Sequence, residues 1–447
     1  MRITTLPTPE LGNRSYLVDD GTSTVIIDPQ RDIDRIDPLI EHDVAYVLET
    51  HIHNDYVSGG AELARRTGAA YGVNRDDPVR FEHLPLEDGQ VFGVGSLRVR
   101  VLATPGHTDT HLSYLVTDVA APDAAAALFS GGSLLHGTVG RTDLMGTDRT
   151  EELSRAQWRS ARRLAALDPG TLVMPTHGFG SFCAAGRTGG ADGSTIGDER
   201  TANTALVTPD EQTFVRELID SLTAHPRYYA QMADFNLEGP PVPSLDATFA
   251  RADRDDLARR IRAGSRVIDL RPAAQFAQEH LTGTLSIALG AQFATYLGWL
   301  TQWGEPITVI GPKVSDLIEA RRQLVRIGIE PDAWSWGSLG DLADPTTVAV
   351  SAFERVGWLD FRPQLGDTVL DVRRDDEFAD AHVAGAVNIP LHDLQDRVGE
   401  LPIRRTWVYC QSGFRAGTAA SILAATGIVP VYVDDDFSAA GRLGLTA

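Results

Sequence analysis

Three turns in the first part of the chain carry residue types that bind metals. The segment ETHIHNDYVSGG (49–60) has the H-x-H-x-D spacing of a metal-binding turn, and Tyr56 stands where a further histidine would extend it. Two more histidines stand in TPGHT and PTHG. The predicted ligands are His51, His53, Asp55, His107 and His177. Imidazole and carboxylate groups in such a set suit zinc or non-haem iron, so we predict a metal site rather than isolated structural histidines.

Short apolar segments precede these turns and must position them. Each of four segments has an apolar run followed by a polar loop, which predicts a strand: VAYVLET (44–50), LRVRVLATPGHT (97–108), AAALFSGG (125–132) and GTLVMPTHG (170–178). Because loops at strand ends converge on a common rim, we expect the histidines to meet there.

Other segments indicate turns, a helix and boundaries. SYLV (15–18) and TVIIDP (24–29) predict a β-hairpin, and GGAELARRTG (59–68) predicts a helix. FCAAGRTGGADGSTIGDE (182–199) is rich in glycine and is interpreted as a linker. The proline cluster EGPPVPS (238–244) predicts a domain boundary.

A second chemistry is predicted at Cys410, in WVYCQSGFRAG (407–417). The cysteine lies between an apolar strand and an alanine-rich helix, so backbone N–H groups and the positive helix end face the sulfur. Arg415 adds a full positive charge. Such a field stabilises an anionic sulfur, and we predict that Cys410 and Arg415 act in catalysis. The loop residues predicted to bind substrate are Gln411, Ser412, Gly413 and Phe414.

The second half of the chain contains an internal repeat. The segment VIDLRPAAQFAQEHLTGTLSIAL (267–289) matches VLDVRRDDEFADAHVAGAVNIPL (369–391), and Asp269 recurs 102 positions later as Asp371. Two copies of one α/β unit are the natural interpretation. In the first copy Gly311 stands where the second has its cysteine, so the first copy is predicted to be catalytically silent.

Composition limits the partners and the location. The formal net charge of −21 argues against nucleic acid and anionic membranes. No apolar stretch is long enough to cross a bilayer, and the N-terminal segment does not have a signal-peptide pattern. Two cysteines in 447 residues cannot form a disulfide framework, so we expect a reducing cytoplasm. Cys183, near the His177 turn, is a weaker candidate for sulfur relay, and a small buried residue is the alternative.

The motifs resemble two known families. The D-x-R…E-F…H-x-x-G-A-x-N-I-P run from Asp371 to Pro390 and the C-x-x-G-x-R loop resemble rhodaneses, which carry sulfane sulfur as a cysteine persulfide; this implies Cys410 as the carrier. The histidine turns resemble the metallo-β-lactamase fold. Within it, TPGHT, GRTD (140–143) and STIG are most similar to persulfide dioxygenases, which use one non-haem iron and O2 to oxidise low-molecular-weight thiol persulfides to sulfite and thiol.

The whole chain resembles the fused persulfide dioxygenase–sulfurtransferases of bacteria. The implied fold class is α/β: a metallo-β-lactamase αββα sandwich over 1–245, a silent rhodanese-like domain over 250–350 and an active rhodanese domain over 355–447. The resemblance also suggests Arg141 and Asp143 of GRTD as substrate contacts. Tyr56 is a further candidate for contact with the substrate.

Two positions depart from the family pattern. Gly132 stands where an aspartate ligand is expected, and Tyr56 replaces the histidine that would hold a second metal. We therefore expect one metal, held by His51, His53 and His107. Iron is expected and zinc is the alternative, while the missing carboxylate leaves a metal-free domain open. On this basis Gly132→Asp is expected to tighten metal binding.

The leading prediction is an enzyme that oxidises a thiol persulfide with O2 to sulfite and transfers sulfane sulfur through Cys410, with thiosulfate as a partner. One alternative is a sulfurtransferase whose first domain is a metal-free scaffold. Another is a zinc-dependent thioester hydrolase of the glyoxalase II type, against which Gly132 and Tyr56 both count. A homo-oligomer is expected.

Overall fold

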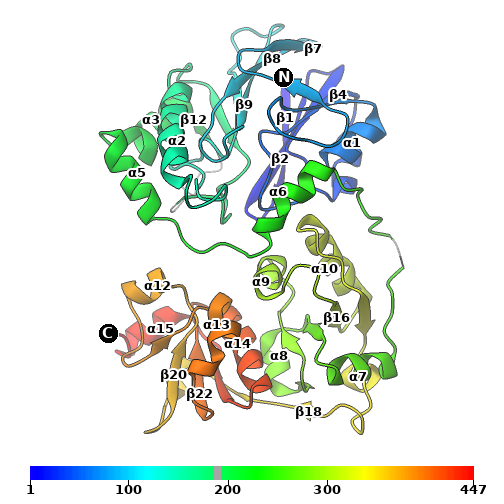
Figure 1. The fold of residues 1–447 in the computed structure, drawn as a ribbon, viewed down its shortest axis with the longest axis vertical. Coiled ribbons are helices and arrows are strands. Elements are labelled where there is room, and N and C mark those ends of the chain that lie inside the picture. Colours follow the sequence, from blue (N-terminus) through cyan, green and yellow to red (C-terminus); the bar gives the residue numbers. More distant parts are fainter. Residues whose placement is uncertain (186–192, 247) are drawn as a thin grey trace. The chain divides into compact units, whose positions relative to one another are not determined.

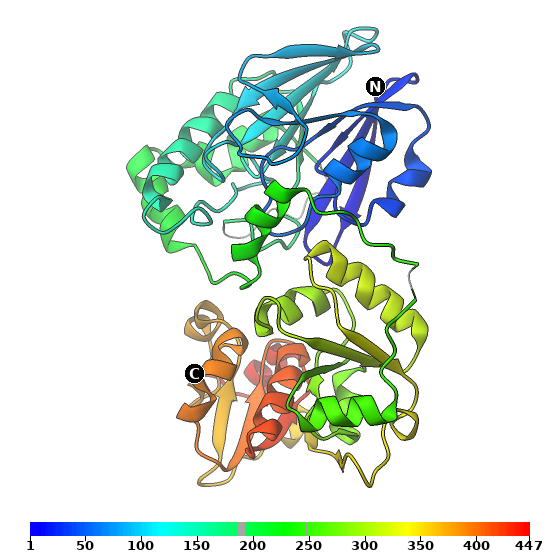
Figure 2. The same cartoon turned by 45° about the vertical axis from the view of Figure 1, so that its right-hand side comes forward.

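The computed structural model describes residues 1–185, 193–246 and 248–447. The chain divides into two compact units. The first comprises Met1–Leu245 with Leu324–Gly328, and the second comprises Asp246–Gln323 with Ile329–Ala447. Figures 1 and 2 show their helices and strands. Among the described residues, no helix combines the length and the apolar character needed to span a membrane.

Two six-stranded sheets form the centre of the first unit. The first sheet contains, in spatial order, β1 (Arg2–Thr8), β2 (Asn13–Asp19), β3 (Ser23–Ile27), β4 (Asp43–Leu48), β5 (Ala70–Asn74) and β6 (Leu84–Leu86). The second contains β12 (Ser194–Thr195), β11 (Leu172–Pro175), β10 (Ala127–Gly131), β9 (Leu112–Asp118), β8 (Leu97–Ala103) and β7 (Val91–Val94).

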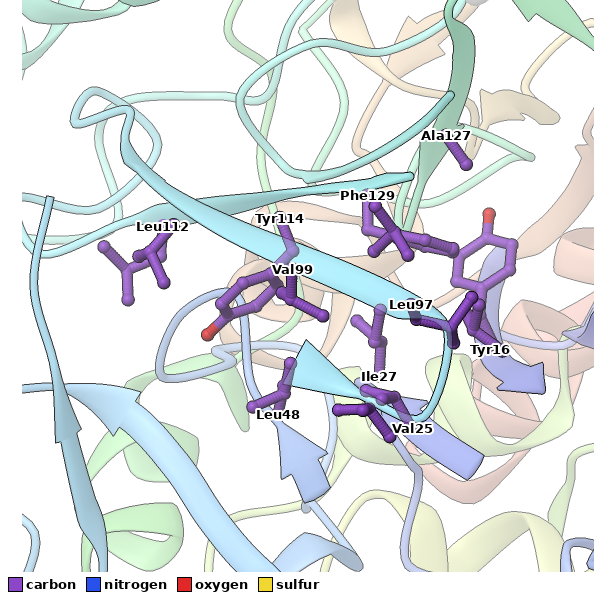
Figure 3. Close-up of a cluster of buried hydrophobic side chains, with 14 of the residues drawn as sticks. Tyr16, Val25, Ile27, Leu48, Leu97, Val99, Leu112, Tyr114, Ala127 and Phe129 are labelled. Carbon is purple, nitrogen blue, oxygen red and sulfur yellow. The ribbon is translucent and has the colours of Figure 1, made fainter. Parts of the chain in front are cut away.

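The two sheets pack face to face through apolar side chains, as Figure 3 shows. Along β8, Leu97 and Val99 are buried while the intervening Arg98 is exposed, because successive side chains of a strand point to opposite faces. Tyr16 of the first sheet meets Phe129 of the second edge to face, with ring centroids 5.2 Å apart. This contact fixes the spacing of the sheets near the end of β10.

Helices cover the outer faces of both sheets. Helix α1 (Gly60–Thr67) buries Leu63 against the first sheet, and α2 (Thr150–Leu164) buries Trp158 against the second. In Figure 1 these two helices lie on opposite sides of the paired sheets. The other helices of the unit are α3 (Ile196–Ala202), α4 (Thr204–Val207), α5 (Glu211–Asp220) and α6 (Tyr229–Glu238). The result is the expected αββα sandwich.

The predicted strands and the predicted helix are confirmed, but the predicted linker is wrong for residues 194–199. These residues form β12 and the start of α3, and α3 begins with a capping box in which Thr195 and Asp198 bond each other's backbone N–H. Residues 186–192 lie outside the described part of the chain. The glycine content of the segment hid a helix start that the T-x-x-D spacing indicates.

The second unit contains two parallel sheets in which four strands follow the same order, and one sheet has a further strand, β19, at its edge. The first is β15 (Leu285–Ser286), β13 (Arg266–Asp269), β16 (Ile307–Gly311) and β17 (Ala333–Trp336). The other is β21 (Val387–Asn388), β20 (Thr368–Asp371), β22 (Arg405–Tyr409), β23 (Val429–Val433) and β19 (Glu354–Val356). The remaining strands are β14 (His280–Leu281) and β18 (Val350–Ser351). This correspondence is what two copies of one unit require.

Helices link the strands of both sheets. They are α7 (Arg254–Arg262), α8 (Ala273–Gln278), α9 (Phe293–Leu300), α10 (Val314–Arg326), α11 (Leu339–Leu342), α12 (Asp375–Asp380), α13 (Leu391–Arg397), α14 (Phe414–Ala425) and α15 (Phe437–Arg442). Short 3-10 helices lie at Ile33–Arg35, Asp37–Leu39, Trp358–Asp360 and Val398–Glu400.

The D-x-R motif forms the same ion pair in both copies. Arg271 Nη2 donates to Asp269 Oδ2 at 2.6 Å, and Arg373 Nη2 donates to Asp371 Oδ2 at 2.7 Å. In each pair Nε also donates to the carboxylate. Because the pair occurs with and without a cysteine, it belongs to the fold of the repeat.

Leu97→Ala is expected to destabilise the first unit by about 2–5 kcal/mol, because it leaves a cavity between the two sheets. Leu97 is 1% exposed. Calorimetry of the full chain measures the effect as a lower melting temperature for one transition. Val119→Ala, at a position that is 56% exposed, is the matched control and should change little; equal effects of the two substitutions would contradict this packing.

Candidate functional site

The ends of β4, β8 and β11 bring three buried histidines together. The ring centroids of His51 and His107 lie 4.8 Å apart, and each lies 5.2 Å from that of His177. One ligand atom from each of the three lies within 4.8 Å of the others. The expectation that the strand-end turns converge is confirmed.

Asp28 orders these turns from behind. Its carboxylate accepts hydrogen bonds from Thr50 N at 2.7 Å, from Thr50 Oγ1 at 2.8 Å and from Thr176 Oγ1. Thr50 directly precedes His51, and Thr176 directly precedes His177, so one carboxylate sets both turns. Asp28 has φ +51°, the only positive value for a non-glycine residue within the described ranges, and this strain is held by its full set of bonds.

The hydrogen bonds of His51 and His107 assign their protons. The hydroxyl of Thr50 donates to Asp28, so it accepts from His51 Nδ1 at 2.9 Å. His107 Nδ1 donates to the carbonyl of Arg141 at 2.7 Å. With Nδ1 protonated in both rings, both Nε2 atoms carry lone pairs. Acceptors behind a histidine orient it in this way at metal sites.

His177 is held in the same sense. Asn13 Nδ2 donates to Asp55 Oδ2 at 2.8 Å, which leaves Asn13 Oδ1 to accept from His177 Nδ1 at 3.0 Å. His177 Nε2 then faces His51 Nε2 at 3.2 Å. Two lone pairs at this distance repel unless a cation lies between them, and 3.2 Å is within the spacing of about 2.9–3.4 Å that two ligands about 2.05 Å from one metal adopt.

Burial keeps His51 and His107 neutral and ready to bind a metal. Burial and the neighbouring imidazoles lower the pKa of His51 well below its usual value. Burial, with His177 nearby, lowers the pKa of His107 to about 3. His107 Nε2 is buried without a hydrogen-bond partner. The three residues therefore fit a metal such as zinc or iron.

His53, predicted as a ligand beside His51 and His107, has its ring centroid 4.1 Å from that of His51 but directs its Nε2 toward two carboxylates. Its Nε2 lies 3.1 Å from Glu49 Oε2, 3.3 Å from Asp28 Oδ1 and 2.9 Å from the Tyr56 hydroxyl. Burial alone lowers the pKa of His53, but the two carboxylates outweigh burial and raise it to about 10. His53 Nδ1 is buried without a hydrogen-bond partner. His177 completes the converging trio, and the ligand role predicted for His53 stays a prediction.

A second group of ligand atoms is formed by His53, Asp55 and His177. It shares His177 with the first group. Burial raises the pKa of Asp55, but His177 and its hydrogen bonds lower it further, so the carboxylate is charged and supports the ring of His177. One shared histidine serves one metal, and a ligand role for His53 or Asp55 stays a prediction.

Tyr56 is fully buried and stacks on His53, with ring centroids 4.2 Å apart. Its hydroxyl lies between His53 Nε2 and the carbonyl of Asp28. These contacts make Tyr56 a positioning residue for His53. Contact between Tyr56 and a substrate stays a prediction.

The absence of a side chain at Gly132 leaves room for the ring of His107. A Cβ atom built at Gly132 would overlap the His107 ring. On the other side, Gly132 N donates to His111 Nε2 at 3.0 Å, and His111 stacks on His51 with centroids 4.9 Å apart. The structure therefore reverses the expectation that Gly132→Asp tightens metal binding. Sequence reasoning missed His111, although its place four residues after His107 was a signal.

Arg141 and Asp143 hold the site together. Arg141 Nε and Nη2 fork onto the Asp143 carboxylate at 2.7 Å each. Nη1 donates to the carbonyl of Phe182, and Nη2 also donates to that of Thr223. The Arg141 carbonyl fixes His107, so the GRTD motif orients a ligand. Substrate binding by this pair stays a prediction. Burial raises the pKa of Cys183 well above its usual value, which favours a small buried residue there.

The cysteine loop has the predicted strand–loop–helix setting. Cys410 follows β22 and is 1% exposed, and Ala416 N donates to its sulfur at 3.4 Å. Gly413 has φ +90°, which a side chain would strain. Arg415 does not present a free charge, because Nη1 and Nη2 donate to the Glu377 carboxylate at 2.6 and 2.8 Å. Sequence reasoning missed Glu377 as a partner of Arg415.

Family models match both parts of the chain. A metallo-beta-lactamase superfamily model matches residues 8–177, and a rhodanese-like domain model matches residues 357–437. The chain has a metallo-β-lactamase fold followed by a rhodanese-like domain. A solved metallo-beta-lactamase from Staphylococcus aureus has a TM-score of 0.67 and 26% identity, covering 75% of this chain and 98% of its own. Both domains are of enzyme families, and the histidines of the first imply a metal.

Two kinds of curated relative match the part of the chain that contains the metallo-β-lactamase domain. A hydroxyacylglutathione hydrolase of Acidiphilium cryptum is 34% identical over 172 residues, which are 37% of this chain and 65% of that protein. A beta-lactamase hydrolase-like protein of Xylella fastidiosa is 28% identical over 284 residues, 54% of this chain and 62% of that protein. The chain thus spans less than two thirds of the length of these relatives.

Gly132→Asp in the metallo-β-lactamase domain is expected to weaken metal binding by about tenfold or more, because the new side chain displaces His107, one of the converging trio. Gly132→Ala is the matched variant and should weaken binding similarly, since it adds the same Cβ without a carboxylate. Metal titration with a competing chelator measures both. Tighter binding by the aspartate variant would show that the carboxylate joins the ligands.

Asp77 is expected to make the metallo-β-lactamase domain less stable as pH rises. Burial raises the pKa of Asp77 to about 7, although Thr110 donates to it at 2.5 Å. The folded state therefore binds more protons than the unfolded state between about pH 4 and 7, and stability falls across that window. Each pKa unit corresponds to about 1.4 kcal/mol.

Asp77→Asn should flatten this pH dependence, because the amide stays neutral and can still accept from Thr110. Calorimetry at a series of pH values follows the transition that Leu97→Ala shifts. Asp76→Asn, at the exposed neighbouring position, should keep the wild-type slope. Identical slopes for Asp77→Asn and the wild type would contradict the assignment.

Proposed function

We propose that this protein oxidises a low-molecular-weight thiol persulfide at the histidine site and transfers sulfane sulfur through Cys410. The first reaction is RSSH + O2 + H2O → RSH + SO3²⁻ + 2H⁺, in which the outer sulfur is oxidised and O2 is reduced. The second moves one sulfur atom between Cys410 and a thiol, sulfite or thiosulfate. Its substrates are thus small sulfur compounds and O2.

The observation that carries the proposal is a single set of three convergent imidazoles in a chain that also has a cysteine–arginine loop. His51, His107 and His177 supply three neutral ligands, which suffice for one metal and leave positions for small molecules. An iron ion held there would supply the activation of O2 that oxidation of a sulfur atom requires. The Cys410 loop makes a sulfur substrate the common element of both domains.

The chain's own residues contribute orientation and charge. Thr50, Asn13 and the Arg141 carbonyl hold the three rings so that their Nε2 atoms meet. The three ligands carry no charge, so the metal's charge stays uncompensated by its ligands and favours an anionic persulfide. Burial of all three histidines excludes bulk water from the ring contacts.

A zinc-dependent thioester hydrolase is a second candidate, because the Acidiphilium relative is a hydroxyacylglutathione hydrolase. Hydrolysis at a two-metal site needs both ions clamped. Here Gly132 lacks the bridging carboxylate, and Tyr56 occupies the place of a second-metal histidine and packs on His53. These features favour one metal and count against the hydrolase.

A metal-free scaffold that serves Cys410 is the third candidate, and the absence of a carboxylate ligand at Gly132 favours it. It differs from the proposal in one measurable quantity. The proposal requires about one metal per chain, and the scaffold requires none.

Crossed variants test the two activities. His177→Ala should abolish bound iron and oxygen uptake on a persulfide but leave sulfur transfer from thiosulfate. Cys410→Ser should abolish the transfer and leave bound iron and oxygen uptake. Metal analysis measures bound iron, and an oxygen electrode measures oxygen uptake. Transfer of sulfur from thiosulfate to a thiol acceptor measures the second activity. Transfer that survives Cys410→Ser, or iron that persists in His177→Ala, would contradict the proposal.

A further inference from the structure

Comparison of the two rhodanese copies distinguishes residues that the fold requires from residues that the cysteine chemistry requires. Both copies keep the D-x-R ion pair. Glu377, in contrast, corresponds to Gln275 in the first copy, 102 positions earlier. The loop of the first copy aligns 99 positions earlier, with Gly311 at the place of Cys410, so Asp316 occupies the place of Arg415. Glu377 and Arg415 thus occur together only in the copy that has the cysteine.

The contact between Glu377 and Arg415 is direct and sheltered. Two nearly parallel hydrogen bonds of 2.6 and 2.8 Å join the guanidinium to the carboxylate, and the side chains are 13% and 20% exposed. Burial raises the pKa of Glu377, but Arg415 outweighs burial and lowers it. Both groups are therefore charged, and a forked pair of this kind is strong and fixed in geometry.

The pair cancels the charge that the loop would otherwise offer. The neighbouring Arg374 is paired in turn with Asp376 through bonds of 2.9 Å from Nε and from Nη2. Two arginines and two carboxylates beside the loop sum to no net charge. A dianion such as thiosulfate consequently finds a guanidinium that is already neutralised and a carboxylate that repels it.

One wall of the same site is aromatic and comes from the silent copy. Tyr296 on α9 packs against Phe414, with ring centroids 5.4 Å apart, and is 8% exposed. Burial raises the pKa of Tyr296 to about 12, and Cys410 and Arg415 are close enough to act on it. An aromatic wall favours a carbon-bearing substrate over an inorganic ion.

We propose that Glu377 sets the charge selectivity of the Cys410 site, so that the cysteine is loaded by an organic persulfide with at most one negative charge in preference to dianionic thiosulfate. Glu377 is a positioning residue that acts through Arg415. The inference rests on the proposed sulfur transfer at Cys410 and names its donor class.

The two donors differ in what leaves. With an organic persulfide, the Cys410 thiolate forms a bond to the outer sulfur, the RS–S bond breaks, and the electron pair leaves on the thiolate RS⁻. With thiosulfate, the same attack on the outer sulfur breaks the S–S bond and releases sulfite, SO3²⁻. Both steps leave one sulfane sulfur on Cys410 and need no further oxidant.

Glu377→Gln in the full chain tests the inference, because the amide keeps the shape and can still accept from Arg415 but removes the negative charge. The ratio of kcat/KM for thiosulfate to that for 2-hydroxyethyl persulfide should rise by about tenfold, equivalent to about 1.4 kcal/mol. Most of the change should be in KM for thiosulfate. An unchanged or lower ratio overturns the inference.

Two variants serve as controls. Glu377→Asp keeps the charge and should restore a ratio close to that of the wild type. Asp376→Asn removes a charge from the same helix without touching Arg415, and its effect on the ratio should stay within about twofold because exposed charges are screened. An equal rise in Asp376→Asn would mean that the overall local charge, and not the Glu377–Arg415 pair, sets the selectivity.

Two measurements on the unmodified protein complete the test. Its kcat/KM for thiosulfate should not fall steeply with added salt, since the two arginines beside the loop, Arg415 and Arg374, are paired with carboxylates. A steep fall overturns the inference even if Glu377→Gln does not fold. Mass spectrometry shows whether either donor adds one sulfur atom to Cys410. If neither does, the proposed transfer fails, and the inference fails with it; loading with an unchanged donor ratio overturns only the inference.

Discussion

The buried carboxylate of Asp28 is the constraint on which the histidine site depends. It lies at the end of β3 and accepts hydrogen bonds from the turns that follow β4 and β11. A buried anion must be compensated, and here the compensation comes from the backbone and hydroxyls immediately before His51 and His177 and from the ring of His53. The same group therefore fixes two converging rings and contacts Nε2 of a third, His53, whose ring lies beside that of His51.

Two substitutions in the metal-binding pattern have one combined consequence. Tyr56 packs on His53 and bonds its Nε2, which keeps that ring against Asp28 and Glu49. The absence of a side chain at Gly132 leaves room for the His107 ring, and the backbone N–H of Gly132 donates to His111 Nε2. What remains is a set of three neutral imidazoles. Residues at the two substituted positions therefore take part in the packing and hydrogen bonds of the site, rather than only removing ligands from the expected pattern.

The second unit applies one scaffold twice. Four parallel strands of the same order recur in both copies, and the D-x-R pair forms at the end of the corresponding strands β13 and β20. The cysteine, its arginine and Glu377 occur once. The copy without them still contributes, since its helix α9 places Tyr296 against the loop of the other. The copy that has Gly311 in place of a cysteine thus contributes a side chain beside the cysteine loop of the other copy.

Local pattern determined the elements, the convergence of the histidine turns and the strand–loop–helix setting of Cys410, because alternation, periodicity and turn residues act over a few positions. It could not decide which ring faces which partner. The sequence does not distinguish His53 from His177 as a ligand, yet folding brings Nε2 of His53 to Asp28 and Glu49 and Nε2 of His177 to that of His51. Likewise the sequence alone suggests that Arg415 is a free cation, whereas folding brings Glu377, 38 positions away, into contact with it. These choices depend on desolvated charges and on contacts between distant segments, which only the tertiary structure provides.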